Sequence, residues 1–135
     1  MPAKPLFILL ADDDLEDLEL FEEIILSIAP ETLVKHVFNG KALLDVLEGY
    51  SDDELPHLII LDYNMPQVTG VDALARLNAQ SRYGSVVKLI LSTSRSQIHI
   101  KECLKNGAKD YFVKPDNIRE LEVLVKKMLS MCAVR

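Results

Sequence analysis

The chain alternates between short apolar runs and longer amphipathic stretches, and this alternation repeats five times. A short apolar run between turn residues is typical of a strand buried on both faces, whereas apolar positions three and four apart indicate a helix. Strands that alternate with helices predict a parallel sheet built from βαβ units. The expected strands are Leu6–Ala11, Val34–Phe38, Leu58–Leu61, Val86–Leu91 and Tyr111–Val113.

The stretch after each expected strand carries a helical spacing of apolar residues. Pro30 is expected to end the first helix and Gly107 to follow the fourth, because these residues are common at helix ends. Asp14 precedes the first helix and is interpreted as its N-cap. The last helix is expected to bury the side formed by Ile118, Leu121, Val125, Met128 and Cys132.

Continuous apolar runs such as LIIL and VVKLIL indicate that helices cover both faces of the sheet. The sequence therefore predicts a doubly wound, five-stranded α/β fold. Right-handed crossovers restrict the possible strand orders, and one common solution is 2-1-3-4-5. In that order the ligand crevice lies at the carboxyl ends of strands one and three, which is where the chemistry is expected.

The composition agrees with one soluble globular domain: 135 residues, of which 49% are hydrophobic and 27% charged. The domain is expected over residues 1–135, with its core at about 5–131. No apolar run approaches the roughly 18 residues that span a bilayer, and Met1–Lys4 does not resemble a signal peptide. A cytoplasmic location is therefore expected.

Charge and cysteine content exclude some further classes. The net charge of −6 argues against a general attraction to nucleic acid or to anionic membranes. Cys103 and Cys132 lie far apart within expected helices, so reduced, structural cysteines are favoured over a disulfide or a metal pair.

Carboxylates follow two strands that would be neighbours in the predicted sheet. Asp12 and Asp13 follow the first strand and Asp62 follows the third. Adjacent strands lie about 4.8 Å apart, so these groups would crowd one another unless they took up a proton or bound a cation. An oxygen-only cluster suits Mg²⁺. Asp12 and Asp13 alone could equally be turn or cap residues, and their convergence with Asp62 favours the metal site.

Hydroxyl and ammonium groups end the remaining strands of the predicted crevice. Ser92 and Thr93 follow the fourth strand and Lys114 follows the fifth. Each alone would be an ordinary turn or surface residue. Together with a cation, however, they could support attack of a carboxylate on phosphorus to form an acyl phosphate. The sequence has neither a GxxxxGK[ST] nor a GxGxxG motif, so the phosphoryl donor is not expected to be a nucleotide held by such a loop.

The motifs FILLADDD, IILDYNMPQVTG, LILSTS and YFVKP occur in this order over essentially the whole chain. With them the chain resembles the receiver domain of bacterial two-component response regulators, in particular the stand-alone, chemotaxis-type receivers. The resemblance implies a flavodoxin-like (βα)₅ fold. It also implies that a histidine kinase or phosphotransfer protein phosphorylates Asp62.

The resemblance further implies how the site would work. Mg²⁺ would be bound by Asp13, by Asp62 and by the backbone carbonyl of Asn64, with Asp12 behind the ion or contributing through a water molecule. Lys114 would contact the phosphoryl oxygens. The family's peptide bond at this lysine is usually cis, which implies a cis bond between Lys114 and the proline that follows.

Ser92 and Tyr111 occupy the positions of the residues that move together when the family is phosphorylated. Ser92 would turn toward the phosphoryl group and Tyr111 would change position with it, although a tyrosine in a short strand can also be simple packing. The response would appear on the face formed by the fourth helix, the fifth strand and the fifth helix, where a downstream protein would bind. No output domain and no direct nucleic-acid or membrane partner are expected.

Two other functions are compatible with parts of the pattern. A phosphohydrolase with an aspartyl-phosphate intermediate would need an acid two residues beyond the nucleophile, where this chain has Asn64. A receiver-like scaffold that is never phosphorylated would be favoured if Asp13, Asp62 or Lys114 were absent, and all are present. The expected function is therefore a regulator that assists only its own phosphorylation and dephosphorylation.

Overall fold

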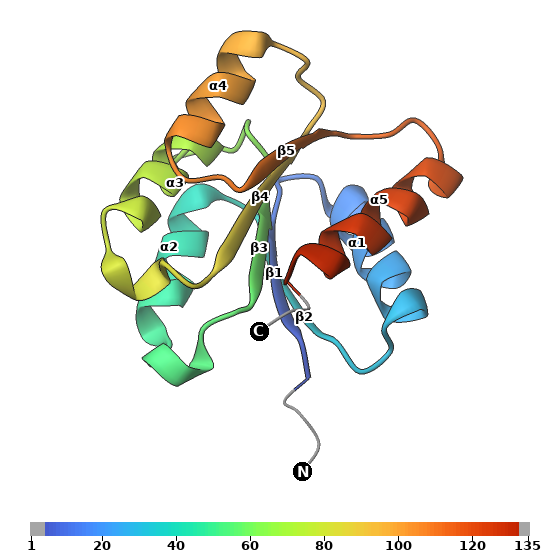
Figure 1. Ribbon diagram of the computed structural model, residues 1–135, viewed down its shortest axis with the longest axis horizontal. Helices are drawn as coiled ribbons and strands as arrows, with labels where there is room; N and C mark the ends of the chain where they lie inside the picture. Colours follow the sequence, from blue (N-terminus) through green and yellow to red (C-terminus); the bar gives the residue numbers. More distant parts are fainter. Residues whose placement is uncertain (1–4, 133–135) are drawn as a thin grey trace.

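A computed structural model describes residues 5–132 of the chain. Five parallel strands form one sheet in the order β2-β1-β3-β4-β5, which confirms the predicted flavodoxin-like topology (Figure 1). The strands are β1 (Phe7–Ala11), β2 (Leu33–Val37), β3 (Leu58–Leu61), β4 (Val87–Ser92) and β5 (Asp110–Val113). The helices are α1 (Leu15–Ile28), α2 (Gly40–Gly49), α3 (Gly70–Asn78), α4 (Gln97–Lys105) and α5 (Ile118–Cys132). Two short 3₁₀ turns are η1 (Asp52–Glu54) and η2 (Ser81–Tyr83).

Helices cover both faces of the sheet and form two separate apolar cores (Figure 1). One core lies between the sheet and α2, α3 and α4, and the other between the sheet and α1 and α5. Successive residues of a strand point to opposite faces, so Leu9 joins the first core and Leu10 the second. All residues of β1 and β3 are buried, which explains their continuous apolar runs.

The edge strand β2 is the least buried strand, with residues that are exposed or only partly covered. Leu33 is 49% exposed there. A charged residue, Lys88, is instead buried within β4, where its Nζ donates a hydrogen bond to the Tyr83 carbonyl at 2.8 Å. The run VVKLIL can therefore remain inside the sheet because its one ammonium has a partner.

The ends of the helices follow from local chemistry. Asp14 is the N-cap of α1, as predicted: its side chain accepts a hydrogen bond from the Asp17 N–H at 3.2 Å. The first helix ends at Ile28, just before Pro30. Gly107 follows α4 with a φ of +107°, a backbone conformation that glycine adopts without the strain a side chain would add.

Some sequence-based expectations differ from the structure. Ile118 is 57% exposed because α5 begins there, at the end of the helix, whereas the other four residues predicted for the buried side are indeed buried. No peptide bond within residues 5–132 is cis, so the prediction of a cis bond between Lys114 and Pro115 is wrong. The trans isomer is the one that X–Pro bonds ordinarily prefer, by about 0.5 to 1 kcal/mol.

Other expectations concern single features. Cys103 in α4 and Cys132 in α5 are both buried, which agrees with the expected structural role. Within the part of the chain that the structure describes, no helix has both the length and the apolar character needed to cross a membrane. The expectation for Met1–Lys4, and the outermost part of the domain predicted over 1–135, fall outside the described residues.

Candidate functional site at the carboxyl edge of the sheet

Three carboxylates meet at the carboxyl ends of β1 and β3, as the sequence predicts. Asp12, Asp13 and Asp62 each offer an oxygen that lies within 4.8 Å of the others. The backbone N–H of Asp62 donates to the carbonyl of Ala11 at 2.9 Å, which continues the β1–β3 ladder by one residue beyond the strands. The ladder therefore sets the two strand-end acids beside each other.

The three acids differ in exposure. Asp12 is 8% exposed and the Asp62 side chain 11%, whereas Asp13 is exposed to solvent. All donors of the cluster are oxygens, and at least one position faces solvent and can admit water molecules. The residues present therefore fit a hard divalent cation that keeps part of its hydration shell.

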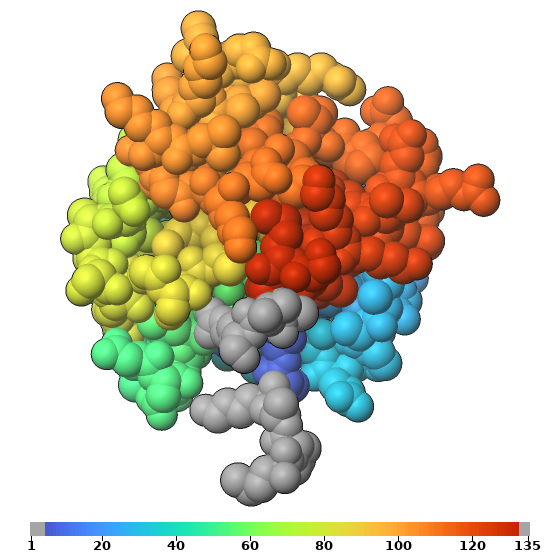
Figure 2. Space-filling model, viewed as in Figure 1, coloured from blue at the N-terminus to red at the C-terminus, as the bar shows by residue number. Residues whose placement is uncertain are grey.

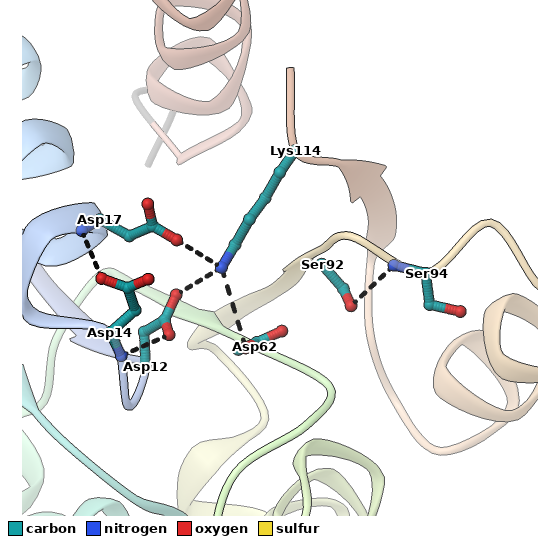
Figure 3. Close-up of polar contacts among 7 residues, drawn as sticks. All are labelled: Asp12, Asp14, Asp17, Asp62, Ser92, Ser94 and Lys114. Carbon is teal, nitrogen blue, oxygen red and sulfur yellow. Dashed lines mark hydrogen bonds and ion pairs between the residues drawn. The ribbon is translucent and has the colours of Figure 1, made fainter. Parts of the chain in front are cut away.

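Lys114, the residue after β5, extends its side chain across the sheet edge toward these acids (Figure 3). Its Nζ lies 2.8 Å from Asp12 Oδ2 and 2.9 Å from Asp17 Oδ2, but 3.8 Å from Asp62 Oδ2. The Lys114 side chain is 16% exposed. One largely buried ammonium therefore forms ion pairs with three carboxylates, and it donates hydrogen bonds to two of them.

Burial and neighbouring charges act in opposite directions on the ionisation of Asp12, Asp62 and Lys114. Burial raises the pKa of Asp62 to about 6, helped by the neighbouring Asp12 charge and opposed by Lys114, the Asn64 backbone N–H and the Ser92 hydroxyl. Burial also raises the pKa of Asp12, against the hydrogen bond from Lys114. Burial alone would lower the pKa of Lys114, yet its hydrogen bonds to Asp12 and Asp17 raise that pKa above its usual value.

Ser92 ends β4 beside Asp62 and is fully buried, with 0% of its surface exposed. Its hydroxyl accepts a hydrogen bond from the Ser94 N–H at 3.3 Å (Figure 3). Thr93, the other hydroxyl predicted here, is exposed. Ser92, and not Thr93, is thus the buried hydroxyl that interacts with Asp62.

Tyr111 lies one strand further across the sheet, in β5, and is 8% exposed. Its ring packs in the core beneath α2, α3 and α4, and its hydroxyl donates a 2.8 Å hydrogen bond to the carbonyl of Ser94. Tyr111 is therefore a packed core residue whose hydroxyl contacts the loop that follows Ser92, and its movement on phosphorylation stays a prediction.

Two residues that the sequence did not single out also border the site. Asp17 pairs with Lys114 as described above, and His99 stacks on Tyr63 with ring centroids 4.2 Å apart. His99 Nδ1 also lies 2.7 Å from Ser94 Oγ. Asp17 looks like any acid in the first turn of a helix, and His99 lies far from Tyr63 in sequence, so no local pattern distinguishes them.

A cavity of about 90 Å³ lies behind the acidic cluster, between the sheet and helices α1 and α5. Most of its wall is apolar. All charged residues of its lining belong to the site described above. Its lining includes Asp12, Asp17, Asp62 and Lys114 together with Leu10, Leu18, Phe21, Ile60, Leu91, Pro115 and Leu121.

Comparison with known families shows which family the chain belongs to. Residues 8–126 match the model of the response regulator receiver domain. Because this match spans most of the chain, the protein belongs to the receiver domain family of two-component response regulators.

Curated relatives agree with this assignment. The two-component response regulator ORR3 of Oryza sativa subsp. indica is 30% identical over 129 residues, which cover 96% of this chain and 95% of the relative. The two-component response regulator ARR8 of Arabidopsis thaliana is 28% identical, and the match covers 91% of this chain and 60% of that protein. These relatives are plant proteins, so the family extends beyond the bacterial regulators that the motifs first suggested.

Solved structures share the fold. A phosphorylated cyanobacterial phytochrome response regulator, RcpA, superposes with a TM-score of 0.87 at 23% identity, covering 96% of this chain and 95% of that one. The Mn²⁺-bound form of the response regulator Rcp1 gives a TM-score of 0.84 at 23% identity, with 97% of each chain covered. The chemotaxis response regulator CheY4 of Vibrio cholerae gives 0.78 at 24% identity, over 93% of this chain and 99% of that one.

Proposed function

We propose that this protein is a phosphorylation-dependent signalling switch with Asp62 as the phosphoacceptor. The observation that carries the proposal is the convergence of Asp12, Asp13 and Asp62 with Lys114 at one edge of the sheet. A buried carboxylate, further acids for a cation and a fixed ammonium are the parts that acyl phosphate formation requires. Membership of the receiver domain family supports the same assignment.

Asp62 is suited to act as the nucleophile. Above its pKa of about 6 the carboxylate is mainly ionised, so an oxygen lone pair is available near neutral pH. One carboxylate oxygen forms a bond to phosphorus while the bond from phosphorus to the donor breaks. The donor is the phosphohistidine of a histidine kinase or phosphotransfer protein, whose imidazole leaves and takes up a proton.

The other residues of the site stabilise the charge that accumulates. Asp13, Asp62 and the backbone carbonyl of Asn64 would hold Mg²⁺, with Asp12 directly behind it or bound through water. When bound, the cation neutralises the phosphoryl oxygens. Lys114 donates to a phosphoryl oxygen, and Ser92 donates its hydroxyl from the other side of Asp62.

The switch rests on the contacts of Ser92 and Tyr111. If the Ser92 hydroxyl turns to the phosphoryl group, it gives up its present hydrogen bond from Ser94 N–H. Ser94 also accepts the hydrogen bond of the Tyr111 hydroxyl, so movement of this loop changes the position favoured by Tyr111. Phosphorylation thereby shifts an equilibrium between two arrangements of β4, β5 and the loop between β4 and α4.

The output surface is the face formed by α4, β5 and α5, which is continuous in the space-filling view, from orange to red (Figure 2). Ile98, at the start of α4, is 70% exposed, and Ile118, at the start of α5, is 57% exposed. Exposed apolar side chains beside an element that moves can anchor a protein partner in one state. A downstream protein, and not nucleic acid or membrane, is the proposed partner, in the cytoplasm.

The protein is not proposed to be a turnover enzyme. Asn64 stands two residues beyond the acceptor, and its amide cannot take up or release a proton as a hydrolase acid or base would. The protein therefore assists only its own phosphorylation and dephosphorylation.

The test is phosphorylation by a small donor. Wild-type protein incubated with Mg²⁺ and acetyl phosphate should gain one phosphoryl group in an intact-mass measurement, and Asp62→Asn should gain none. Asp116→Asn, which removes an exposed acid from the loop after Lys114, is the matched control and should be phosphorylated like the wild type. Failure of the wild type, or equal phosphorylation of Asp62→Asn, would overturn the proposal. Continuous release of phosphate over many turnovers would favour a hydrolase.

A further inference from the structure

The ammonium of Lys114 is occupied by residues other than the acceptor. It donates hydrogen bonds to Asp12 at 2.8 Å and to Asp17 at 2.9 Å. Its distance to Asp62 is 3.8 Å, which is an ion pair but too long for a hydrogen bond. In this arrangement the cation that should contact the phosphoryl group is turned partly away from the residue that receives it (Figure 3).

Asp17 reaches Lys114 from a different element than the acidic cluster. It lies in the first turn of α1, and its backbone N–H donates to the capping carboxylate of Asp14 at 3.2 Å. The cap fixes the backbone of Asp17 and so directs its side chain from α1 toward the end of β5. Asp17 is not one of the three acids that could share a cation.

We propose that Asp17 is a positioning residue that holds the Lys114 ammonium back from Asp62 in the unphosphorylated protein and thereby slows phosphorylation. This inference rests on the proposed function, because it concerns the same site. Asp17 competes with the incoming phosphoryl group for one ammonium. Lys114 leaves Asp17 when the phosphoryl group, with about two negative charges, arrives on Asp62.

The structure allows this exchange. The Asp17 side chain is 45% exposed, so its ion pair with Lys114 is screened by solvent and weak enough to break. Asp12, with an 11% exposed side chain, keeps its hydrogen bond and guides the ammonium over the short remaining distance to Asp62. Lys114 and Asp17 both border the cavity described above, so packing does not lock the lysine side chain in place.

The first test compares rates of phosphorylation. Asp17→Asn should be phosphorylated by acetyl phosphate about two- to fivefold faster than wild type, the factor expected for loss of one partly exposed ion pair. Glu16→Gln is the matched control: it removes an exposed acid from the same helix turn and should leave the rate unchanged. An equal acceleration in Glu16→Gln would mean that only the local charge matters, which would overturn the inference.

The second test asks whether the effect passes through Lys114. In a Lys114→Ala background, Asp17→Asn should no longer change the rate, because the ammonium that Asp17 retains is gone. A merely structural role of Asp17 would act equally in both backgrounds. Asp17→Glu keeps a carboxylate within reach of Lys114 and should lie nearer to wild type than Asp17→Asn does.

The outcomes separate this inference from the proposed function. If the wild type is not phosphorylated on Asp62, the proposed function fails. If the wild type is phosphorylated but Asp17→Asn is unchanged or slower, or its effect persists without Lys114, only the role of Asp17 fails.

Discussion

At the scale of single residues, Asp62 combines burial with an ionisable group. Burial disfavours its charge, and Lys114 at 3.8 Å compensates only in part, so the pKa of the carboxyl is raised to about 6. The ionised carboxylate of Asp62 is therefore unfavourable in the folded protein, and binding of a cation beside it makes that charge more favourable. The buried acceptor therefore lowers the free energy of unfolding of the protein near neutral pH.

Replacing Asp62 by Asn should stabilise the protein near neutral pH. In the unfolded chain the carboxyl has its ordinary pKa of 3.8, so between about pH 4 and pH 6 the folded protein holds a proton that the unfolded chain has lost. The free energy of unfolding contributed by Asp62 is therefore greatest at low pH and falls as the pH rises through this window. Asp62→Asn should remove that fall and gain about 1 to 2 kcal/mol near neutral pH.

Urea denaturation at a series of pH values, with a chelator present, measures this effect. The difference between the two proteins should appear as the pH rises from about 4 to 6 and stay constant above. A difference that is the same at every pH would contradict the assignment of the raised pKa to Asp62.

Mg²⁺ should stabilise the wild type, and more at neutral pH than at about pH 5, because a proton on Asp62, whose pKa is about 6, competes with the cation there. Binding only to the folded state contributes about 2.7 kcal/mol when Mg²⁺ is at roughly 100 times its Kd, and this raises the Tm.

Asp13→Asn should largely lose the increase of Tm that Mg²⁺ causes in the wild type. Asp14→Asn removes a neighbouring charge but retains a good N-cap, so it should keep the shift. Equal shifts in both variants would argue against Asp13 as a ligand.

At the scale of elements, the segment between β3 and α3 is shaped by close backbone contacts. The N–H of Gly70 donates to the carbonyl of Tyr63 at 2.8 Å, which folds the chain back beside the acceptor. A Cβ on Gly70 would meet the carbonyl oxygen of Asp62 and would lie 2.9 Å from Tyr63 Cα. Glycine therefore permits α3 to begin directly against the residue that follows β3.

Gly70→Ala should consequently destabilise the fold and slow phosphorylation together. Overpacking of this kind costs about 1 to 3 kcal/mol, and here the displaced atoms belong to the acceptor's own backbone. Gly49→Ala is the matched control, since a Cβ there meets nothing within 4 Å. It should change stability by no more than about 1 kcal/mol and leave phosphorylation intact. Thermal unfolding and the acetyl phosphate assay measure both, and equal behaviour of the two variants would refute the steric explanation.

At the scale of the whole molecule, the two cores give the sheet a rigid centre and leave movement to its connecting loops. The strands β1 and β3 are buried throughout, whereas the segment after Ser92 is held by hydrogen bonds from single side chains. A change at Asp62 can therefore rearrange the loop between β4 and α4 without disturbing the packed centre.

Hydrogen exchange should reveal this division. On phosphorylation, amide exchange is expected to change in residues 93–97 and 111–113, where the Ser92, Ser94 and Tyr111 contacts lie, and to remain unchanged in β1 and β3. Mass-spectrometric exchange with and without acetyl phosphate measures it, with Asp62→Asn as the control that should show no change. Changes confined to β2 and α2 would contradict the proposed route.

Much of the architecture could be predicted from the sequence because it depends on local pattern. The bounds of β3 agree with the expectation, since His57 and Asp62 delimit an apolar run on both sides. By contrast, β4 extends to Ser92, because the N–H of Lys114 donates to the Ser92 carbonyl and lengthens the ladder. The crossover rules only restricted the strand order, and the common solution 2-1-3-4-5 is the one observed; in that order the acids after β1 and β3 lie beside each other.

The rest of the site depends on contacts between distant elements. The pairing of Asp17 with Lys114 and the stacking of His99 on Tyr63 require the direction of side chains on separate elements, which periodicity does not specify. The cis bond at Lys114 was expected from resemblance alone, and the structure has the trans isomer.

The order of the strands has a practical consequence. Asp62 follows β3, Ser92 ends β4 and Tyr111 lies in β5, so the signal crosses only two strand spacings, about 10 Å, before it reaches an edge of the sheet. The opposite edge, β2, lies beyond β1 and off this route. A fluorescent reporter or a fused domain inserted in the turn between α1 and β2 should leave signalling intact, so this edge is the natural place to label the protein in a living cell.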